Sequence, residues 1–131
     1  MLIANPRDIH QMVKDLRKLP FNVLPAVNTL LNSLAENEEF RKLDFSGLRI
    51  SIGAGMAVHQ AVADKWLALT GCPICEAYGL TETSPAATCN PILAREWSGT
   101  IGMPLPSTEI AILDDVGRHR AHGRARPYTH C

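Results

Sequence analysis

The fold is decided by the stretch Leu48-Arg49-Ile50-Ser51-Ile52-Gly53-Ala54-Gly55, taken together with Ile74-Cys75-Glu76-Ala77-Tyr78-Gly79. In residues 48–52 apolar side chains alternate with polar ones, which predicts a short strand. Residues 58–69 then carry apolar side chains at helical spacing, and Gly71 suits the end of that helix. The second quoted stretch predicts another strand. Strand, helix and strand within about 30 residues predict a βαβ unit with parallel strands.

The two glycine-bearing loops of this unit, residues 53–55 and 79–82, follow the two predicted strands directly. Because the strands run in the same direction, both loops leave the sheet at the edge formed by the carboxyl ends. Ligands of open α/β sheets bind at that edge. The sequence therefore predicts a ligand site between these two loops.

The residues before this unit predict more helices. Asn5-Pro6 predicts a helix start, since asparagine caps helices and proline suits the first helical position. Apolar residues follow at helical spacing over residues 9–16, and a second helix is predicted over residues 27–34. Pro20 and Pro25 predict an interruption of regular structure between the two helices.

The residues after this unit predict a change to antiparallel structure. Residues 86–89 predict a third strand, and the glycines and prolines of residues 99–106 predict an irregular loop. Alternation over residues 110–113 and a turn at residues 114–117 predict the start of an antiparallel β region. The expected fold class is α/β, with a parallel βαβ portion running into an antiparallel region.

Composition narrows the class of protein. The 131 residues predict one domain, and a formal net charge of zero points to neither nucleic acid nor a membrane surface. No apolar run approaches the ~20 residues of a membrane span, and the first residues lack the features of a secretory signal. Four cysteines are too few for a disulfide scaffold. We therefore expect a cytoplasmic protein with reduced thiols and no nucleic-acid partner.

The stretch Tyr78-Gly79-Leu80-Thr81-Glu82-Thr83-Ser84-Pro85 holds most of the chemistry. An aromatic ring at a strand end can stack on a flat base, and Gly79 lets a ligand approach the backbone. The Thr81 hydroxyl can contact a phosphate oxygen, and the Glu82 carboxylate is a hard ligand for Mg²⁺. The alternative interpretation is a polar turn that caps the next element, because threonine and serine are good helix caps.

The segment Tyr78-Gly79-Leu80-Thr81-Glu82 resembles the Y-G-x-T-E motif of the adenylate-forming (AMP-binding) superfamily. Residues 53–56 resemble the adenine-side loop that precedes this motif by about 25 residues in that family. Residues 27–30, 43–46 and 99–104 resemble the long-chain fatty-acyl-CoA synthetase branch (fatty acid:CoA ligases). The resemblance covers residues 1–117 in the family order.

The resemblance implies an acid–thiol ligase reaction in which ATP, a fatty acid and CoA give acyl-CoA, AMP and pyrophosphate. It implies that Tyr78 stacks on adenine and that Thr81 and Glu82 act in catalysis, Thr81 on the α-phosphate and Glu82 on Mg²⁺. It also implies a sheet belonging to the large N-terminal domain, and a parent enzyme compatible with peripheral membrane association. The remaining residues that it places along the nucleotide and the acyl-adenylate are Gly53, Ala54, Gly55, Glu76, Ala77, Gly79 and Leu80.

Two positions depart from the family pattern. Ala77 stands where glycine is usual, which tightens the fit of backbone to ligand. Pro25-Ala26 stands where Thr-Gly is common, at the acyl channel.

The family's lysine-bearing phosphate loop, its T-G-D aspartate and its C-terminal lysine domain have no counterpart in the 131 residues. We therefore expect residues 1–117 to be part of an AMP-binding domain, an internal fragment that is inactive alone. The alternative is a small protein that binds a nucleotide or an acyl group without catalysis.

Residues 118–131 hold four arginines, three histidines and no acid. We interpret this segment as an aberrant tail, and its composition is compatible with a frameshift.

Four other candidates are assigned ordinary roles. Cys72 and Cys75 form a C-x-x-C, but the pair runs into a strand and no second pair accompanies it, which argues against a redox or zinc site. His59 is expected at the surface and Trp66 in the core. Ser84 lacks the surroundings of a hydrolase nucleophile.

Overall fold

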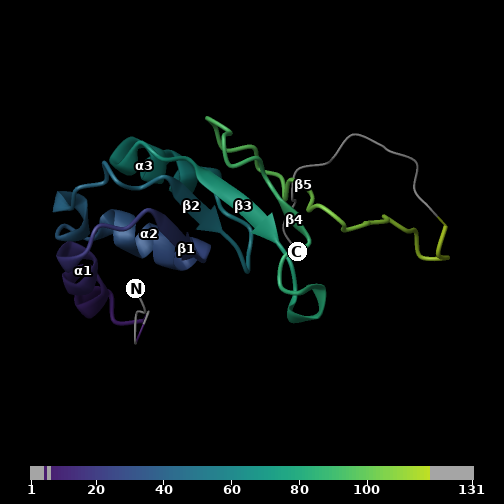
Figure 1. The fold of residues 1–131 in the computed structure, drawn as a ribbon, viewed down its shortest axis with the longest axis horizontal. Helices are drawn as coiled ribbons and strands as arrows, with labels where there is room; N and C mark the ends of the chain where they lie inside the picture. The colour runs from purple at the N-terminus through teal and green to yellow at the C-terminus, as the bar shows by residue number, and fades with distance from the viewer. Residues whose placement is uncertain (1–4, 6, 119–131) are drawn as a thin grey trace.

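The computed structural model describes residue 5 and residues 7–118, and shows helices packed against one mixed sheet (Figure 1). The predicted tail therefore lies, except for Arg118, outside the described residues. The elements in chain order are α1 (Ile9–Lys18), β1 (Val23–Ala26), α2 (Asn28–Glu36), η1 (Phe40–Lys42), β2 (Ile50–Gly53), α3 (Gln60–Thr70), β3 (Ile74–Tyr78), η2 (Thr81–Thr83), β4 (Thr88–Cys89) and β5 (Met103–Pro104).

The sheet has the order β1-β2-β3-β4-β5, so that each strand lies beside the strand that precedes it in the chain. β1, β2 and β3 are parallel, whereas β4 pairs antiparallel with β3 and β5 antiparallel with β4. The predicted fold class, a parallel βαβ portion leading into antiparallel structure, is confirmed.

The first strand, β1, contradicts the predicted interruption around Pro25. This residue lies inside β1, where it pairs with Ile52 of β2. Proline is tolerated there because β1 is the edge of the sheet, where one side of the strand needs no hydrogen-bond partner. The parallel part of the sheet therefore contains two βαβ units and not one.

The helix ends test the predicted caps. α1 begins at Ile9, and the Asp8 side chain caps it by accepting a hydrogen bond from the Gln11 backbone N–H at 3.0 Å. The predicted start at Asn5-Pro6 was therefore placed too early. At the end of α3, Gly71 adopts φ 69° and donates its N–H to the Leu67 carbonyl, as its sequence position predicts.

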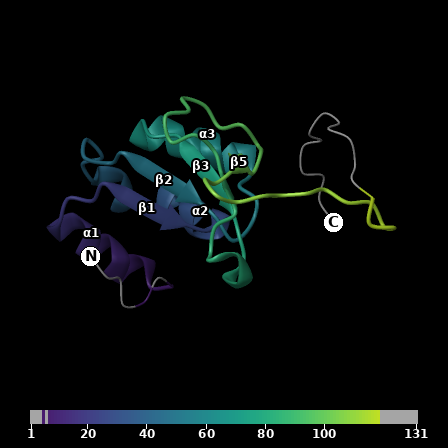
Figure 2. The same ribbon diagram turned by 45° about the vertical axis from the view of Figure 1, so that its right-hand side comes forward.

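α2 and α3 contact each other and cover one face of the parallel strands (Figure 2). On this face Leu24, Ser51 and Ile74 are buried side by side in register. The Trp66 indole of α3 is fully buried and donates its N–H to the Ser51 hydroxyl at 2.9 Å. The predicted core role of Trp66 is confirmed. The middle strand β2 thus places a serine against the helices, and the hydroxyl group of this serine has hydrogen-bond partners.

The opposite face of these strands is less covered. Val23 is 48% exposed, and Ile50 and Ile52 are half-buried. Cys75 lies on this face next to Ile52 but is buried, because the chain after β4 passes over it. An apolar surface therefore remains on this side of the sheet.

The predicted third strand at residues 86–89 is present as the shorter β4, which begins the antiparallel region. Residues 110–113 form no strand in the described chain and lead away from the sheet (Figures 1 and 2). The predicted turn at residues 114–117 is present, since Gly117 donates its N–H to the Asp114 carbonyl at 2.9 Å. None of the helices in the described residues has the length and apolar character that a membrane crossing requires.

Candidate functional site

A pocket of about 210 Å³ lies at the carboxyl edge of the parallel strands. Residues 53–57 and 76–80, which include parts of the two predicted loops 53–55 and 79–82, supply most of its wall. The predicted site residues that line it are Gly53, Gly55, Glu76, Ala77, Tyr78, Gly79 and Leu80, and they are joined by Met56, Ala57 and Ile101.

The remaining predicted residues lie beside the pocket and not in its wall. Ala54 is half-buried in the first loop, and Thr81 and Glu82 are exposed in η2, directly after Leu80. The lining residue Ile101 comes from the loop between β4 and β5 and was not predicted as a site residue. Its position in the segment 99–104, which resembles the fatty-acyl-CoA synthetase branch, was a signal that could have found it.

The glycines of the pocket are packed so closely that side chains are excluded. A methyl group at Gly53 would overlap the side chains of Val58 and Ile74. A methyl group at Gly79 would overlap the backbone of Pro85 and Ala86. Only glycine fits at these two positions, so the pocket is lined there by backbone atoms without a side chain.

Tyr78 ends β3 at the pocket, and its side chain is 40% exposed. The backbone of Tyr78 is held on its β4 side, because Tyr78 pairs with Thr88 and its carbonyl accepts the Ala87 N–H at 2.8 Å. The residue is thus fixed by its backbone while part of its ring stays accessible to a ligand.

The η2 turn presents its side chains in a fixed arrangement. The Thr83 hydroxyl accepts the Leu80 backbone N–H at 2.8 Å, and Ser84 adopts φ 59° to close the turn. Thr83 is therefore occupied by the turn itself. The side chains of Thr81 and Glu82 are exposed and form no hydrogen bond with another described residue.

Glu76 is a buried acid in the wall of the pocket, with 7% of its surface exposed. Its Oε1 accepts the Val58 backbone N–H at 3.0 Å, whereas its Oε2 has no hydrogen-bond partner among the described residues. Burial raises the pKa of this carboxyl group above its ordinary value, and the hydrogen bond from Val58 partly opposes the rise. The sequence predicted a role only for its backbone, so the buried side chain is a new feature of the site.

Three thiols lie close to the strand that carries Glu76. The sulfur atoms of Cys75 and Cys89 are 3.4 Å apart, and burial raises the pKa of Cys75 to about 12. Cys72 is also buried and free. Over residues 7–118 no group of three or more metal-binding side chains is brought together.

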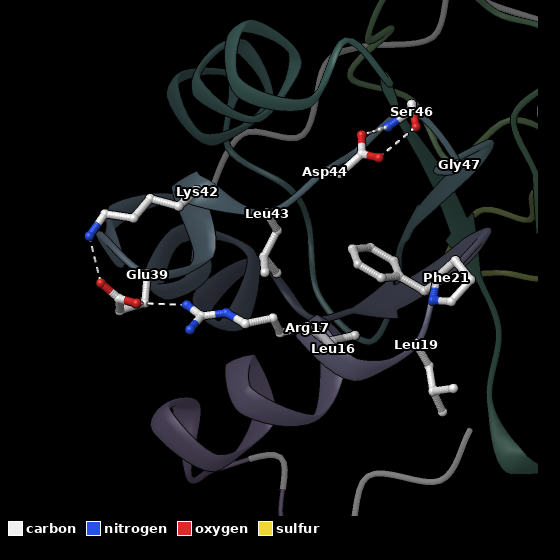
Figure 3. Close-up of a pocket in the computed structure, with 11 residues that line it drawn as sticks. Leu16, Arg17, Leu19, Phe21, Glu39, Lys42, Leu43, Asp44, Ser46 and Gly47 are labelled. Atoms are coloured by element: carbon white, nitrogen blue, oxygen red, sulfur yellow. Dashed lines mark hydrogen bonds and ion pairs between the residues drawn. The ribbon is translucent and has the colours of Figure 1, made fainter.

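A larger hollow, of about 600 Å³, lies at the other edge of the sheet (Figure 3). Residues of α1, the α1–β1 connection and the segment from η1 to β2 line it. Arg17 and Lys42 both pair with Glu39 at 2.6 Å, and these contacts hold the pKa of Glu39 at about 2. Glu39 thus neutralises both cations of this hollow, and none of the predicted site residues lines it.

Comparison with known proteins agrees with this geometry. A family model described as AMP-binding enzyme matches residues 1–125. The chain belongs to the AMP-binding enzyme family. The resemblance inferred from the Tyr78–Glu82 motif is thereby confirmed.

Curated relatives in the AMP-binding family are long-chain-fatty-acid–CoA ligases. The chain is 55% identical over 117 residues to the ligase of Yersinia pestis, a match that covers 89% of this chain and 21% of the relative. It is 49% identical over 125 residues to the ligase of Haemophilus influenzae, covering 95% of this chain and 22% of the relative. The chain thus spans about a fifth of the length of these relatives.

Solved structures of other proteins share the fold. An anthranilate CoA ligase in complex with anthranoyl-AMP superposes with a TM-score of 0.83 at 21% identity, covering 95% of this chain and 24% of that one. MatB from Rhodopseudomonas palustris with ATP bound superposes with a TM-score of 0.73 at 25% identity, and the match covers 88% of this chain and 23% of MatB.

Proposed function

We propose that the chain is the part of a long-chain fatty acid:CoA ligase that carries the Y-G-L-T-E portion of the ATP and acyl-adenylate site. The observation that carries the proposal is the single pocket edge at which residues 53–57 meet residues 76–80. High identity to long-chain-fatty-acid–CoA ligases across the same residues supports the substrate class. We place the reaction in the cytoplasm, with a parent enzyme able to associate with the membrane periphery.

Each residue of the edge has a proposed task in binding the nucleotide. The Tyr78 ring stacks on adenine, and its 40% exposure leaves a face for that contact. The bare backbone of Gly53, Ala54 and Gly55 lines the other side of the base. The backbone of Glu76, Ala77, Gly79 and Leu80 runs along the acyl-adenylate.

The residues present fit ATP with Mg²⁺. Protein sites hold Mg²⁺ through one or two carboxylates together with substrate phosphates, so one exposed carboxylate is enough. Glu82 is such a carboxylate, and Thr81 beside it offers a hydroxyl to the α-phosphate. Bound Mg²⁺ supplies positive charge that offsets the charge of the phosphates. MatB, which shares this fold, was solved with ATP bound.

The part played by these residues in catalysis is positioning. In phosphoryl and adenylyl transfer the protein contributes mainly orientation and charge stabilisation. The backbone-fixed Tyr78 and the η2 turn hold the base and phosphate contacts within one short chain segment. The nucleotide is thereby oriented with its α-phosphate toward Thr81.

The proposal is tested with a chimera of the Yersinia pestis ligase in which residues 5–117 of this chain replace the matching segment. We expect ATP–pyrophosphate exchange with a long-chain fatty acid within about tenfold of the parent. A chimera that melts cooperatively like the parent but shows no exchange contradicts the proposal. A chimera that binds ATP without exchange would instead support the non-catalytic binding module.

We propose further that the AMP-binding portion ends near residue 117 and that residues 118–131 are the product of a frameshift. The DNA that encodes them decides this. If neither shifted frame restores sequence similar to the curated ligases after residue 117, the frameshift proposal is wrong.

A further inference from the structure

Two buried polar atoms lack a hydrogen-bond partner in the described part of the chain, and they are complementary. One is the acceptor Oε2 of Glu76, and the other is the donor Nε1 of Trp97. Trp97 is one of the groups that lower the pKa of Glu76, so the indole and the carboxyl group are neighbours, yet the two atoms do not form a hydrogen bond. Because buried polar groups are costly when unpaired, such a pair calls for an explanation.

The other oxygen of Glu76 fixes the first wall of the pocket. Its bond to the Val58 N–H, at 3.0 Å, holds the chain directly after the 53–57 loop. The next residue is held as well, since His59 donates its N–H to the Asn28 side chain at 3.0 Å. This wall is therefore anchored both to β3 and to α2.

Ile101 forms a second wall of the pocket, and Trp97 belongs to the same loop as Ile101 without lining the pocket itself. This loop lies between β4 and β5, runs beside β3 and ends at the pocket residue Ile101 (Figures 1 and 2). The Trp97 ring packs on the hydrophobic core. The start of this loop is fixed to β3, because Asn90 donates its N–H to the Glu76 carbonyl at 2.9 Å.

A bond between Glu76 and Trp97 would thus join the two walls through one side chain. Backbone bonds hold Glu76 in the strand, so the adjustment that forms this bond falls on the Trp97 loop. A ligand seated between Ala57 and Ile101 contacts both walls and favours that adjustment.

We propose that Glu76 is a positioning residue: one carboxylate oxygen holds the adenine-side wall through Val58, and the other accepts the Trp97 indole N–H when a nucleotide occupies the pocket. The inference rests on the proposed function and adds to it a residue pair that sets the spacing of the pocket walls.

The test uses the active chimera described above. Glu76→Gln keeps an oxygen for Val58 but places an amide N–H₂ opposite Trp97, and Trp97→Phe keeps an aromatic ring without the N–H. Each is expected to raise the KM for ATP roughly tenfold, the scale of a hydrogen bond to a charged group, with a smaller change in kcat. Glu96→Gln is the matched control, because it removes an exposed charge beside Trp97 and is expected to leave both constants unchanged.

The double variant separates a shared bond from two independent effects. If Glu76 and Trp97 act through one bond, the double variant has the KM of either single variant, whereas independent effects multiply to roughly a hundredfold. ATP is also expected to change the fluorescence contributed by Trp97, measured as the difference between the chimera and its Trp97→Phe variant. Glu76→Gln is expected to abolish that change.

The inference is overturned if the KM effects of the two substitutions multiply, or if the fluorescence of Trp97 still responds to ATP in Glu76→Gln. The proposed function is not affected by either result as long as the chimera shows exchange. Loss of exchange in the unmutated chimera would contradict the proposed function itself. Glu76→Ala removes both bonds and is expected to lower the melting temperature as well. If it fails to fold, the Gln and Phe variants still decide the question.

Discussion

Glu82 is the single exposed carboxylate of the η2 turn, and its charge is the property that the proposed role requires. In the chimera, Glu82→Gln keeps the shape of the side chain and removes the charge that binds Mg²⁺. We expect adenylation to fall by ~10²-fold or more, as for the loss of one transition-state charge contact. ATP–pyrophosphate exchange measured over a range of Mg²⁺ concentrations checks this. A near-parental rate at limiting Mg²⁺ would remove Glu82 from the site.

Tyr78 offers a ring, and stacking on a base does not depend on its hydroxyl group. Tyr78→Phe is therefore expected to leave the KM for ATP within a few-fold of the parent value. Tyr78→Ala should raise it clearly, because a base–aromatic stack contributes on the order of 1–3 kcal/mol. Steady-state kinetics on the two variants compares them directly. Equal losses would assign the role to the hydroxyl group.

Glu76 makes stability depend on pH with a definite sign. Burial raises the pKa of Glu76 in the folded state. The stability that the protonated carboxyl group contributes is therefore fully present below its unfolded pKa and is lost as pH rises through its folded pKa. Glu76→Gln cannot ionise, so we expect its melting temperature relative to the parent chimera to rise between pH 5 and pH 8. A difference that stays constant across this range would show that the carboxyl group is not desolvated.

At the scale of elements, the turn after β3 depends on the close approach of two backbone segments at Gly79. A methyl group there would overlap the Pro85 carbonyl. We expect Gly79→Ala to destabilise the chimera by ~1–3 kcal/mol, the usual cost of overpacking, and to raise the KM for ATP. Thermal melts and kinetics measure both. Gly47→Ala is the control, because its added methyl group meets its neighbours at an ordinary 3.7 Å.

The regular elements were predictable wherever local pattern and tertiary packing agree. Apolar spacing was enough to predict α2, α3, β2 and β3, and the glycine that ends α3. β1 was missed because Pro25 argues against a strand, and only its position at the sheet edge makes proline acceptable. Residues 110–113 alternate like a strand, yet the described chain offers them no neighbouring strand to pair with.

The backbone of the site was predictable for a related reason. Consecutive parallel strands must place their carboxyl ends at one edge, so the meeting of the two glycine loops follows from topology alone. The Glu76 side chain could not be predicted, because an acid in a strand normally points to solvent and its partner Val58 lies 18 residues away. Trp97 was missed since nothing local places that loop beside β3.

At the scale of the whole molecule, the 131-residue polypeptide alone is expected to show no ATP–pyrophosphate exchange. Its sequence contains no lysine-bearing phosphate loop, so nothing in it holds the leaving pyrophosphate. Exchange assayed with a long-chain fatty acid and Mg²⁺ tests this. Any exchange above that of the Glu82→Gln polypeptide would show that these residues suffice for the reaction.

The same polypeptide is also expected to self-associate through the uncovered face of the sheet, which carries Val23, Ile50 and Ile52. Light scattering after gel filtration measures this. Val23→Lys places a charge on the edge strand and should shift the population toward monomer. Leu93→Thr is the control, since Leu93 is 91% exposed but belongs to the loop between β4 and β5 and not to these strands. Equal behaviour of the two variants would assign the association to another surface.

The order of the strands in the sheet has a consequence for biosynthesis. Each strand from β1 to β5 lies beside the strand made just before it. A nascent chain that leaves the ribosome from its N-terminus can therefore add one strand at a time to a partner that already exists. Among the described residues, Ile101 is the last one along the chain that lines the pocket. Both walls can be in place, and able to meet a nucleotide, while translation of the downstream codons is still under way.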